Sequence, residues 1–325
     1  IFDAGAELVR ITARNISEAK TLSDIRKQLV SSGYHQPLAA DIHFNPAIAM
    51  EAARRVEKIR INPGNFVDLF PKKIRYTEAE YNQEIDEIRK TVLPLIGVCR
   101  ENGTAVRIGI NGGSLNRRII DRFGNTTQAM VESALEFIQL FHDEHFHNLV
   151  ISIKASDVKN MIHANRLLAQ RCMDNGFDYP IHLGVTEAGE GEDGRMKSAA
   201  GTGSLLMDGI GDTIRVSLTE APEKEIPVAL EIIKSARKNA ADKQIAKEFF
   251  AVANPFGHYL NDAETKSQEK PHVSSEAISQ TSDININLLR KQFIADPDET
   301  MTLHWNPADC SASDFSIVAG TFLAD

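Results

Sequence analysis

Apolar residues follow two different periods along this chain. In several short stretches they alternate with polar residues, which is the period of a strand, and in longer stretches they recur three and four positions apart, which is the period of a helix. The predicted strands span residues 7–12, 37–44, 58–63, 105–110, 148–155, 181–188 and 213–219. The clearest predicted helices span residues 17–33, 80–103, 126–145 and 158–176, and several of them end at a glycine.

Strand and helix alternate over about the first 220 residues, and this order predicts repeated βα units on a parallel sheet. The predicted fold class is α/β, and seven such strands indicate a TIM-type (β/α)8 barrel whose first strand we expect upstream of residue 1. A doubly wound open sheet is the alternative, but its G-x-G-x-x-G phosphate loop does not follow the first strand. We expect a barrel domain over residues 1–222 and an incomplete accessory α/β domain over residues 223–325.

Composition and charge narrow the class of protein. The chain has 325 residues, 42% of them hydrophobic and 25% charged, so it has enough apolar material for a large core. Its net charge of −9 argues against nucleic-acid binding, which needs a clustered excess of Lys and Arg. No window approaches the roughly 20 apolar residues of a membrane helix, which predicts a soluble, cytoplasmic protein with no membrane partner.

Candidate metal ligands are few. The three cysteines form no C-x-x-C pair and are interpreted as small buried hydrophobic residues: Cys99, Cys172 and Cys310. The stretch FHDEHFH (141–147) resembles a metal cluster, but it closes a predicted helix at the end of the barrel opposite to the usual active site. Asp41 and His43 share one strand face and lack a third ligand, so substrate contact is the favoured interpretation. We predict no metal site in this chain.

Polar residues occur at the carboxyl end of every predicted strand, where a TIM barrel places its active groups. They are Arg10, Asp41, His43, Arg60, Asn62, Arg107, Asn111, Ser152, Lys154, Thr186, Glu187, Arg215 and Ser217. Five of them are cations, and cations gathered around one pocket repel each other unless an anion compensates them. A diphosphate fits, because guanidinium groups bind phosphate oxygens in pairs. The alternative is a layer of salt bridges, for which only Asp41 and Glu187 are available at matching positions.

Three further features of the sequence bear on such a site. Glu187 is the best candidate for a catalytic acid or base, and helix capping is its alternative role. The stretch NGGSLN (111–116) follows a strand and could present backbone N–H groups to a phosphate. The stretch GTGSLL (201–206) lies in a predicted helical region, where its glycines indicate close packing.

Five stretches together carry a resemblance to a known family: ADIHFNPAIAMEA, KIRINPGN, VRIGINGGSL, VISIKASD and HLGVTEAGEGEDGRMKSAAGTGSLLMDGIGDTIRVSLTEAP. In order and in strand position they resemble 4-hydroxy-3-methylbut-2-enyl diphosphate synthase, in its large three-domain form, over residues 4–222. The resemblance implies a barrel that binds 2-C-methyl-D-erythritol 2,4-cyclodiphosphate in the non-mevalonate (MEP) pathway of isoprenoid biosynthesis. Matched motif by motif, it implies that the strand-end residues above, apart from Ser152 and Thr186, form the substrate shell, with Glu187 as the catalytic residue.

The same resemblance implies a cofactor and partners. Members of the family open the cyclic diphosphate reductively, with two electrons that ferredoxin or flavodoxin delivers to a 4Fe-4S cluster. Three Cys and one Glu of a C-terminal domain hold that cluster, and no stretch of this chain matches that domain. We therefore expect this chain to bind substrate but not to turn it over alone. A homodimer, and the plastid stroma in a plant-type organism, are further expectations from the family.

Two other functions stay open at this point. A non-catalytic barrel that binds a phosphate ligand would use the same cations without a redox reaction. A pterin-binding barrel of the dihydropteroate synthase kind would also bind a diphosphate at its strand ends. The stretch IGDTIRVSLTEAP and the five cations favour the isoprenoid enzyme over both alternatives.

Overall fold

A computed structural model describes residues 1–42, 44–70, 73–240 and 323–324. Their strands form two parallel sheets, with the order β1-β2-β3-β4-β5 in one and β6-β7-β8 in the other. The first sheet consists of β1 (Val9–Thr12), β2 (Leu38–Ile42), β3 (Lys58–Ile61), β4 (Ala105–Asn111) and β5 (Leu149–Lys154). The second consists of β6 (His182–Leu183), β7 (Thr213–Ile214) and β8 (Leu323–Ala324). Each of the seven predicted strands is confirmed, although β6 and β7 are shorter than predicted.

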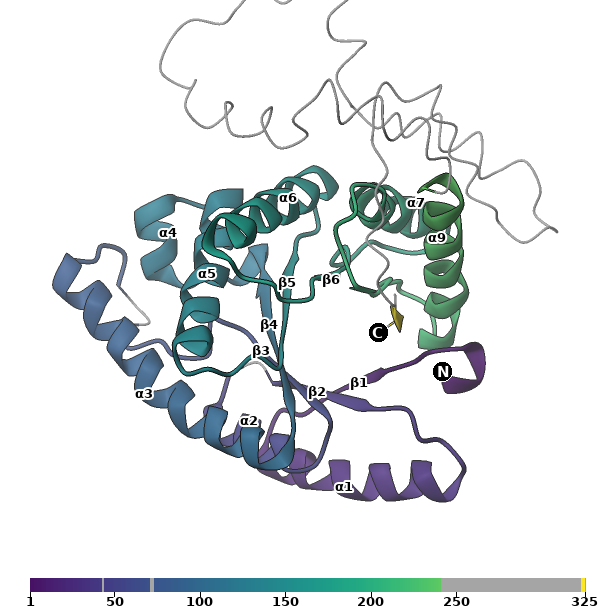
Figure 1. Cartoon of the computed structure of the whole chain (residues 1–325), viewed down its shortest axis with the longest axis horizontal. Helices are drawn as coiled ribbons and strands as arrows, with labels where there is room; N and C mark the ends of the chain where they lie inside the picture. Colours follow the sequence, from purple (N-terminus) through teal and green to yellow (C-terminus); the bar gives the residue numbers. More distant parts are fainter. Residues whose placement is uncertain (43, 71–72, 241–322, 325) are drawn as a thin grey trace, which may run out of the picture.

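Helices surround the strands on the outside (Figure 1). The long ones are α1 (Ile16–Ser31), α3 (Glu78–Asn102), α5 (Thr127–Asp143), α6 (Val158–Asn175) and α9 (Glu225–Ala240). The short ones are α2 (Pro46–Ala53), α4 (Arg117–Phe123), α7 (Gly191–Ser198) and α8 (Ser204–Met207), with a π-helical turn, η3 (Ala199–Gly203), between α7 and α8. Short 3-10 turns are η1 (Phe2–Ala4), η2 (Gly112–Ser114) and η4 (Pro222–Lys224).

Local signals in the sequence explain where the long helices begin and end. Thr77 and Glu80 form a reciprocal capping box at the start of α3, and the Asp157 side chain caps α6. Gly103 and Gly176 follow α3 and α6 with φ of 69°, a left-handed conformation that glycine adopts without a steric penalty. The four helices predicted from the apolar period are confirmed as α1, α3, α5 and α6.

The strand order separates the barrel from the doubly wound alternative. Strands β1 to β5 are neighbours in the order of the sequence, with parallel pairing throughout. An isolated parallel bridge between Ile151 and Ile181 connects β5 to the segment that leads into β6, and β6 then pairs with β7. The order never reverses, whereas a doubly wound sheet reverses at its switch point. The chain therefore winds in one direction, as in a TIM barrel.

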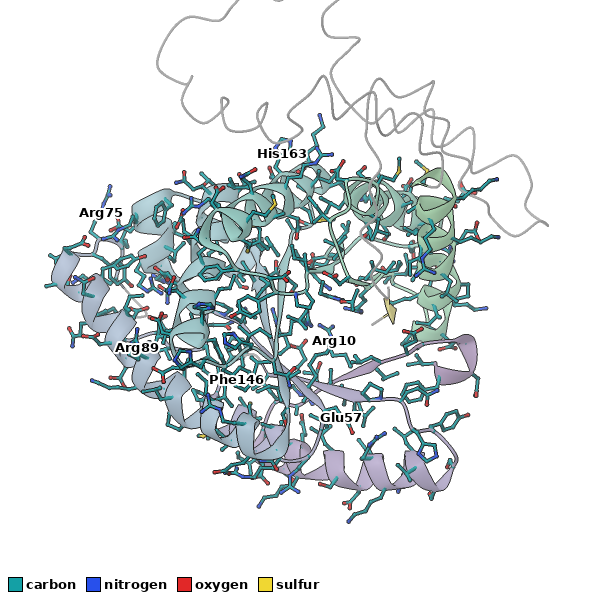
Figure 2. The ribbon with its side chains drawn as sticks, in the orientation of Figure 1. Arg10, Glu57, Arg75, Arg89, Phe146 and His163 are labelled. Atoms are coloured by element: carbon teal, nitrogen blue, oxygen red, sulfur yellow. The ribbon has the colours of Figure 1, made fainter. Side chains whose placement is uncertain are left out.

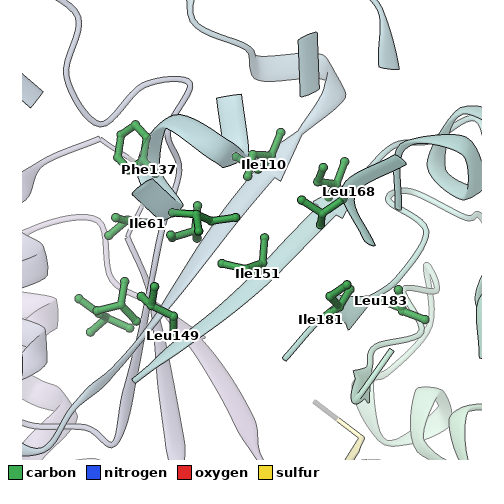
Figure 3. Packing of buried hydrophobic residues seen from close by; sticks show 14 of the residues in the cluster. Ile61, Ile110, Phe137, Leu149, Ile151, Leu168, Ile181 and Leu183 are labelled. Atoms are coloured by element: carbon green, nitrogen blue, oxygen red, sulfur yellow. The ribbon is translucent and has the colours of Figure 1, made fainter. Parts of the chain in front are cut away.

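The two faces of the strands have different partners. Alternate strand residues such as Ile61, Ile110 and Ile151 pack against the helices, where they meet Phe137 of α5 and Leu168 of α6 (Figure 3). Successive side chains of a strand point to opposite faces, so the residues between these apolar ones point into the barrel. Those residues include the cations singled out in the sequence.

Helix α9 covers the barrel next to the N-terminal turn. Its buried residues Ile226, Ala229, Ile232 and Ile233 contribute to the packed interior, and Leu230 approaches Gly5 of the N-terminal segment. The domain boundary at residue 222 stays a prediction. Of the predicted accessory domain, residues 223–240 and β8 are described, and the other residues lie outside the described ones. Among the described residues, no helix is both long enough and apolar enough to cross a bilayer.

Candidate functional site

Asp41 connects two of the predicted cations inside the barrel. Its carboxylate accepts from Arg10 Nη1 at 2.9 Å and from Arg60 Nη1 at 3.0 Å. The side chains of Asp41 and Arg60 are only 3% and 9% exposed, so this ion pair is buried. Figure 2 shows Arg10 inside the ring of helices, while Arg75 and Arg89 lie at its outer edge. A salt bridge, one of the alternatives for the strand-end cations, is therefore present at this position.

Arg60 can extend across β4 because that strand has a glycine two residues beyond Arg107, the residue opposite Arg60. Its Nη2 donates to the Gly109 carbonyl at 2.7 Å, and a Cβ at Gly109 would lie 2.3 Å from Arg60 Nε. Any other residue at position 109 would displace the guanidinium. The contacts with Asp41 and with the Gly109 carbonyl thus fix the direction of the Arg60 side chain.

Cations on β4 and β5 have neutral partners. Arg107 Nη1 donates to Ser152 Oγ at 3.1 Å. Lys154 Nζ lies 2.9 Å from Nε2 of His182, and Nδ1 of that imidazole lies 2.7 Å from Thr213 Oγ1. These hydrogen bonds orient the two cations.

Arg215 has an acidic neighbour that the sequence reasoning did not foresee. Its Nε lies 3.5 Å from Glu225 Oε2, and the same carboxylate accepts from the Leu218 backbone N–H at 3.0 Å. We expected only Asp41 and Glu187 to be available as acidic partners for the cations, and Glu225 shows that this set was incomplete. Glu225, at the start of α9, is placed beside Arg215 by the fold.

The loops after β3 and β4 meet at the same end of the barrel. Asn62 Nδ2 donates to Ser114 Oγ at 2.9 Å, while its Oδ1 accepts from the Gly64 N–H. Asn111 Oδ1 accepts from the Gly113 N–H at 3.2 Å. The two predicted asparagines therefore shape the loops that carry them, and the Gly113 N–H, a candidate phosphate donor in the sequence, already has a partner.

Replacement of Gly64 by alanine should disrupt this junction. An added Cβ would lie 1.6 Å from the Ser114 carbonyl oxygen, and this backbone atom cannot rotate away as a side chain can. We expect Gly64→Ala to lower the free energy of unfolding by about 1–3 kcal/mol, the usual cost of overpacking. Urea denaturation measures this change.

Gly113→Ala is the matched control, because an added Cβ there would meet only Asn111 Oδ1, at 3.8 Å. It should change stability by less than about 0.5 kcal/mol. Equal losses in the two variants would show that the close contact at Gly64 is not the cause.

Glu187 lies in the loop after β6 with an unusual backbone conformation. It has φ of 54°, in the left-handed region, and its side chain is exposed. The preceding residue is held in place, since the Thr186 N–H donates to the Ala155 carbonyl at 3.1 Å. Glu190 is the N-cap residue of α7, so helix capping does not explain Glu187.

His182 is a buried imidazole surrounded by cations of the barrel interior. This imidazole is fully buried, and burial is the largest cause that lowers its pKa well below the usual value. The next causes are all cations, namely Lys154, Arg107, Lys58 and Arg10. Lys58 and His182 were not selected from the sequence. Lys58 lies two residues before Arg60, and His182 lies two residues before Gly184, so each pair points to the same face of its strand. This spacing is the signal in the sequence that could have identified Lys58 and His182.

The described cysteines and histidines do not fit a 4Fe-4S cluster. Cys99 and Cys172 are buried on different helices, and burial raises the pKa of Cys99 to about 12 and that of Cys172 to about 11. They remain thiols, as the sequence interpretation expected, whereas cluster ligands are thiolates. Nowhere in the described part of the chain do three His, Cys, Asp or Glu side chains gather as a metal site. Cys310 lies outside the described residues.

The other predicted residues are placed as follows. The hydroxyl oxygen of Tyr179 lies 3.0 Å from Nδ1 of His142 and 2.9 Å from Nδ1 of His147, near the amino end of β5 and away from the cations. Ser217 follows β7 and is half-buried. Gly201 packs closely, as expected, because a Cβ there would lie 2.7 Å from Met161 and Val185. His43 lies outside the described residues.

Fold and site together define a TIM barrel whose interior is lined by cations from several parallel strands. Residues 1–230 match the family described as the GcpE TIM-barrel domain, and the chain belongs to that family. The barrel predicted from the sequence is thereby confirmed.

Curated proteins with similar sequences belong with the same family. The chain is 53% identical over 236 residues to the 4-hydroxy-3-methylbut-2-en-1-yl diphosphate synthase (flavodoxin) of Phocaeicola vulgatus, covering 72% of this chain and 38% of that protein. It is 57% identical over 230 residues to the enzyme of the same name from Akkermansia muciniphila, covering 70% and 39%. The chloroplastic, ferredoxin-named enzyme of Oryza sativa subsp. japonica is 50% identical over 247 residues, covering 75% and 33%. The chain thus spans well under half the length of these relatives.

Proposed function

We propose that this barrel binds 2-C-methyl-D-erythritol 2,4-cyclodiphosphate for an iron–sulfur oxidoreductase of isoprenoid biosynthesis. The observation that carries the proposal is the group of cations inside the barrel, which together with burial, the larger cause, lower the pKa of His182. A ligand with two linked phosphates would lower the repulsion among these cations and match their guanidinium groups. Relatives named for the synthase, at about half identity, support this ligand over others.

The proposed substrate shell consists of residues from six strands and their loops. Arg107, Lys154 and Arg215 bind phosphate oxygens directly, while Arg10 and Arg60 do so in their pair with Asp41. The asparagine, serine and histidine side chains complete the shell. The proposed members are Arg10, Asp41, His43, Arg60, Asn62, Arg107, Asn111, Lys154, Arg215 and Ser217.

The complete protein would open the ring and remove a hydroxyl with two electrons. A 4Fe-4S cluster would supply these electrons when bound, and we propose that residues other than the described ones hold it. Flavodoxin or ferredoxin is the proposed donor, because the relatives carry these words in their names. A homodimer, and a location in the bacterial cytoplasm or the plastid stroma, are proposed from the same kinship.

Glu187 is the proposed acid or base. Its left-handed backbone costs a residue with a Cβ about 1–2 kcal/mol, and such strain is often retained where a side chain has to be aimed at a substrate. The exposed carboxylate can then reach a ligand above the strand ends. This role predicts that function and stability respond in opposite directions to one substitution.

Glu187→Gly should abolish turnover of the cyclodiphosphate by the full-length enzyme while leaving its stability unchanged or slightly higher. Glycine removes the strain of the left-handed conformation from the folded state. It also stabilises the unfolded state by about 0.5–1 kcal/mol through its greater conformational entropy, so the two effects nearly cancel. Reductive turnover and urea denaturation measure the two quantities.

Glu190→Gly is the control in the same loop. Glu190 has φ of −115°, so glycine relieves no strain there and should lower stability by up to about 1 kcal/mol with turnover retained. If Glu187→Gly retains full turnover, Glu187 is not the catalytic residue.

A further inference from the structure

His182 contacts Lys154 inside the barrel. The imidazole is the first residue of β6 and is fully buried, while Lys154 is the last residue of β5. Lys154 extends over Gly184, where an added Cβ would lie 3.0 Å from Nζ and 3.2 Å from Cε. Gly184 therefore leaves space for the Lys154 side chain, and His182 places an acceptor beside its ammonium group.

The hydrogen bonds of the imidazole define its protonation. An ammonium group only donates, so the contact of 2.9 Å requires an unprotonated Nε2 on His182. The proton of a neutral imidazole then lies on Nδ1, which donates to Thr213 Oγ1 at 2.7 Å. The hydroxyl of Thr213 can accept this bond. One side chain on each of three consecutive strands thus forms a chain of donors and acceptors that ends at the Lys154 ammonium.

Burial and, after it, the surrounding cations lower the pKa of His182 and favour the neutral imidazole. Lys154 of β5, Arg107 of β4, Lys58 of β3 and Arg10 of β1 all disfavour an imidazolium at this position. A neutral acceptor orients the ammonium without cancelling its charge, which a carboxylate at the same position would do.

We propose that His182, held as the Nδ1-protonated tautomer by Thr213, is a positioning residue that fixes the Lys154 ammonium for a diphosphate ligand. The proposal rests on the proposed function, because it assumes that Lys154 binds phosphate. His182 acts through Lys154 and has no contact with the ligand.

Three substitutions separate this role from simple packing, with inorganic pyrophosphate as the probe in calorimetric titrations of the full chain. His182→Gln retains an acceptor near the position of Nε2 and should bind within about threefold of the unmodified protein. His182→Asn places its amide near Nδ1 and removes the hydrogen bond between Nε2 and Lys154, so the affinity should fall about tenfold, as expected for a lost hydrogen bond to a charged group. Thr213→Val, which is close to isosteric, should weaken binding several-fold by releasing the tautomer.

A double-mutant cycle with Lys154→Met gives the sharpest result. Once the ammonium is absent, His182→Asn should have no further effect on pyrophosphate affinity, because the positioned group is missing. A tenfold loss that persists in the Lys154→Met background, or no loss in His182→Asn alone, would overturn the positioning role. Absence of pyrophosphate binding by the unmodified protein would instead contradict the proposed function.

The tautomer is measurable without any ligand. Nitrogen-15 NMR of the histidine side chains should show His182 with a protonated Nδ1 and an unprotonated Nε2 at neutral pH, and His182→Gln assigns the signal by its loss. A protonated Nε2, which would mean that a neutral lysine amine accepts the bond, or an imidazolium, would overturn the proposal even if pyrophosphate binds.

Discussion

Arg107→Ala should weaken binding of the cyclodiphosphate at least about 30-fold. Arg107 is 3% exposed in the middle of β4, and Ser152 orients its guanidinium toward the interior. Removing one member of a buried, charged contact costs about 2–5 kcal/mol of binding free energy, and each 1.4 kcal/mol is a factor of ten. Isothermal titration of the protein with 2-C-methyl-D-erythritol 2,4-cyclodiphosphate at fixed ionic strength measures the loss.

Two variants show whether the site, rather than charge in general, is responsible. Arg89→Ala removes a cation on the outer surface that pairs with Asp143 at 3.3 Å, and it should leave the affinity unchanged. Arg107→Lys keeps the charge but loses the planar fork, so its affinity should lie between those of the alanine variant and the unmodified protein. Unchanged affinity in Arg107→Ala would refute the proposed pocket.

Asp41→Ala should have the largest effect on stability. It would leave Arg10 and Arg60 beside each other inside the barrel without the carboxylate that they share. Breaking a buried ion pair on one side costs about 3–5 kcal/mol, because the remaining charge stays desolvated. Urea denaturation of the ligand-free protein should show this loss as a lower transition midpoint.

The double variant Asp41→Ala/Arg60→Met tests the cause. Replacing both partners removes the uncompensated charge, so it should recover part of the stability that Asp41→Ala loses. Asp143→Ala, which breaks an ion pair at an exposed position, should cost no more than about 1 kcal/mol. Similar losses for Asp41→Ala and Asp143→Ala would mean that burial does not govern the strength of the Asp41 pair.

The elements of the barrel were predictable because their signals are local. Alternation of residues such as Ile59 and Ile61 with Lys58 and Arg60 sets the strand and its two faces at once. Capping residues such as Thr77 and Gly103 define where a helix begins and ends. Helix α2 was not predicted, since its sequence PAIAMEAA has apolar residues on all sides and little amphipathic contrast.

Which side chains pair with the cations inside the barrel was less predictable, because these pairs depend on how the strands and helices are arranged in space. No local pattern connects Arg215 with Glu225, which stands at the start of the helix that follows β7. Nor does the sequence show that Asp41 serves two arginines, or that the Lys154 ammonium meets an imidazole. The contacts of Asp41 and Lys154 arise where the curvature of the sheet brings side chains of neighbouring strands together on the inner face.

Competitive titration of one protein sample with three ligands tests the central claim most directly. We predict that 2-C-methyl-D-erythritol 2,4-cyclodiphosphate binds at one site per chain, that inorganic pyrophosphate competes with it, and that a dihydropterin diphosphate does not bind. Failure of the cyclodiphosphate to bind, or binding of the pterin ligand in its place, would contradict the account.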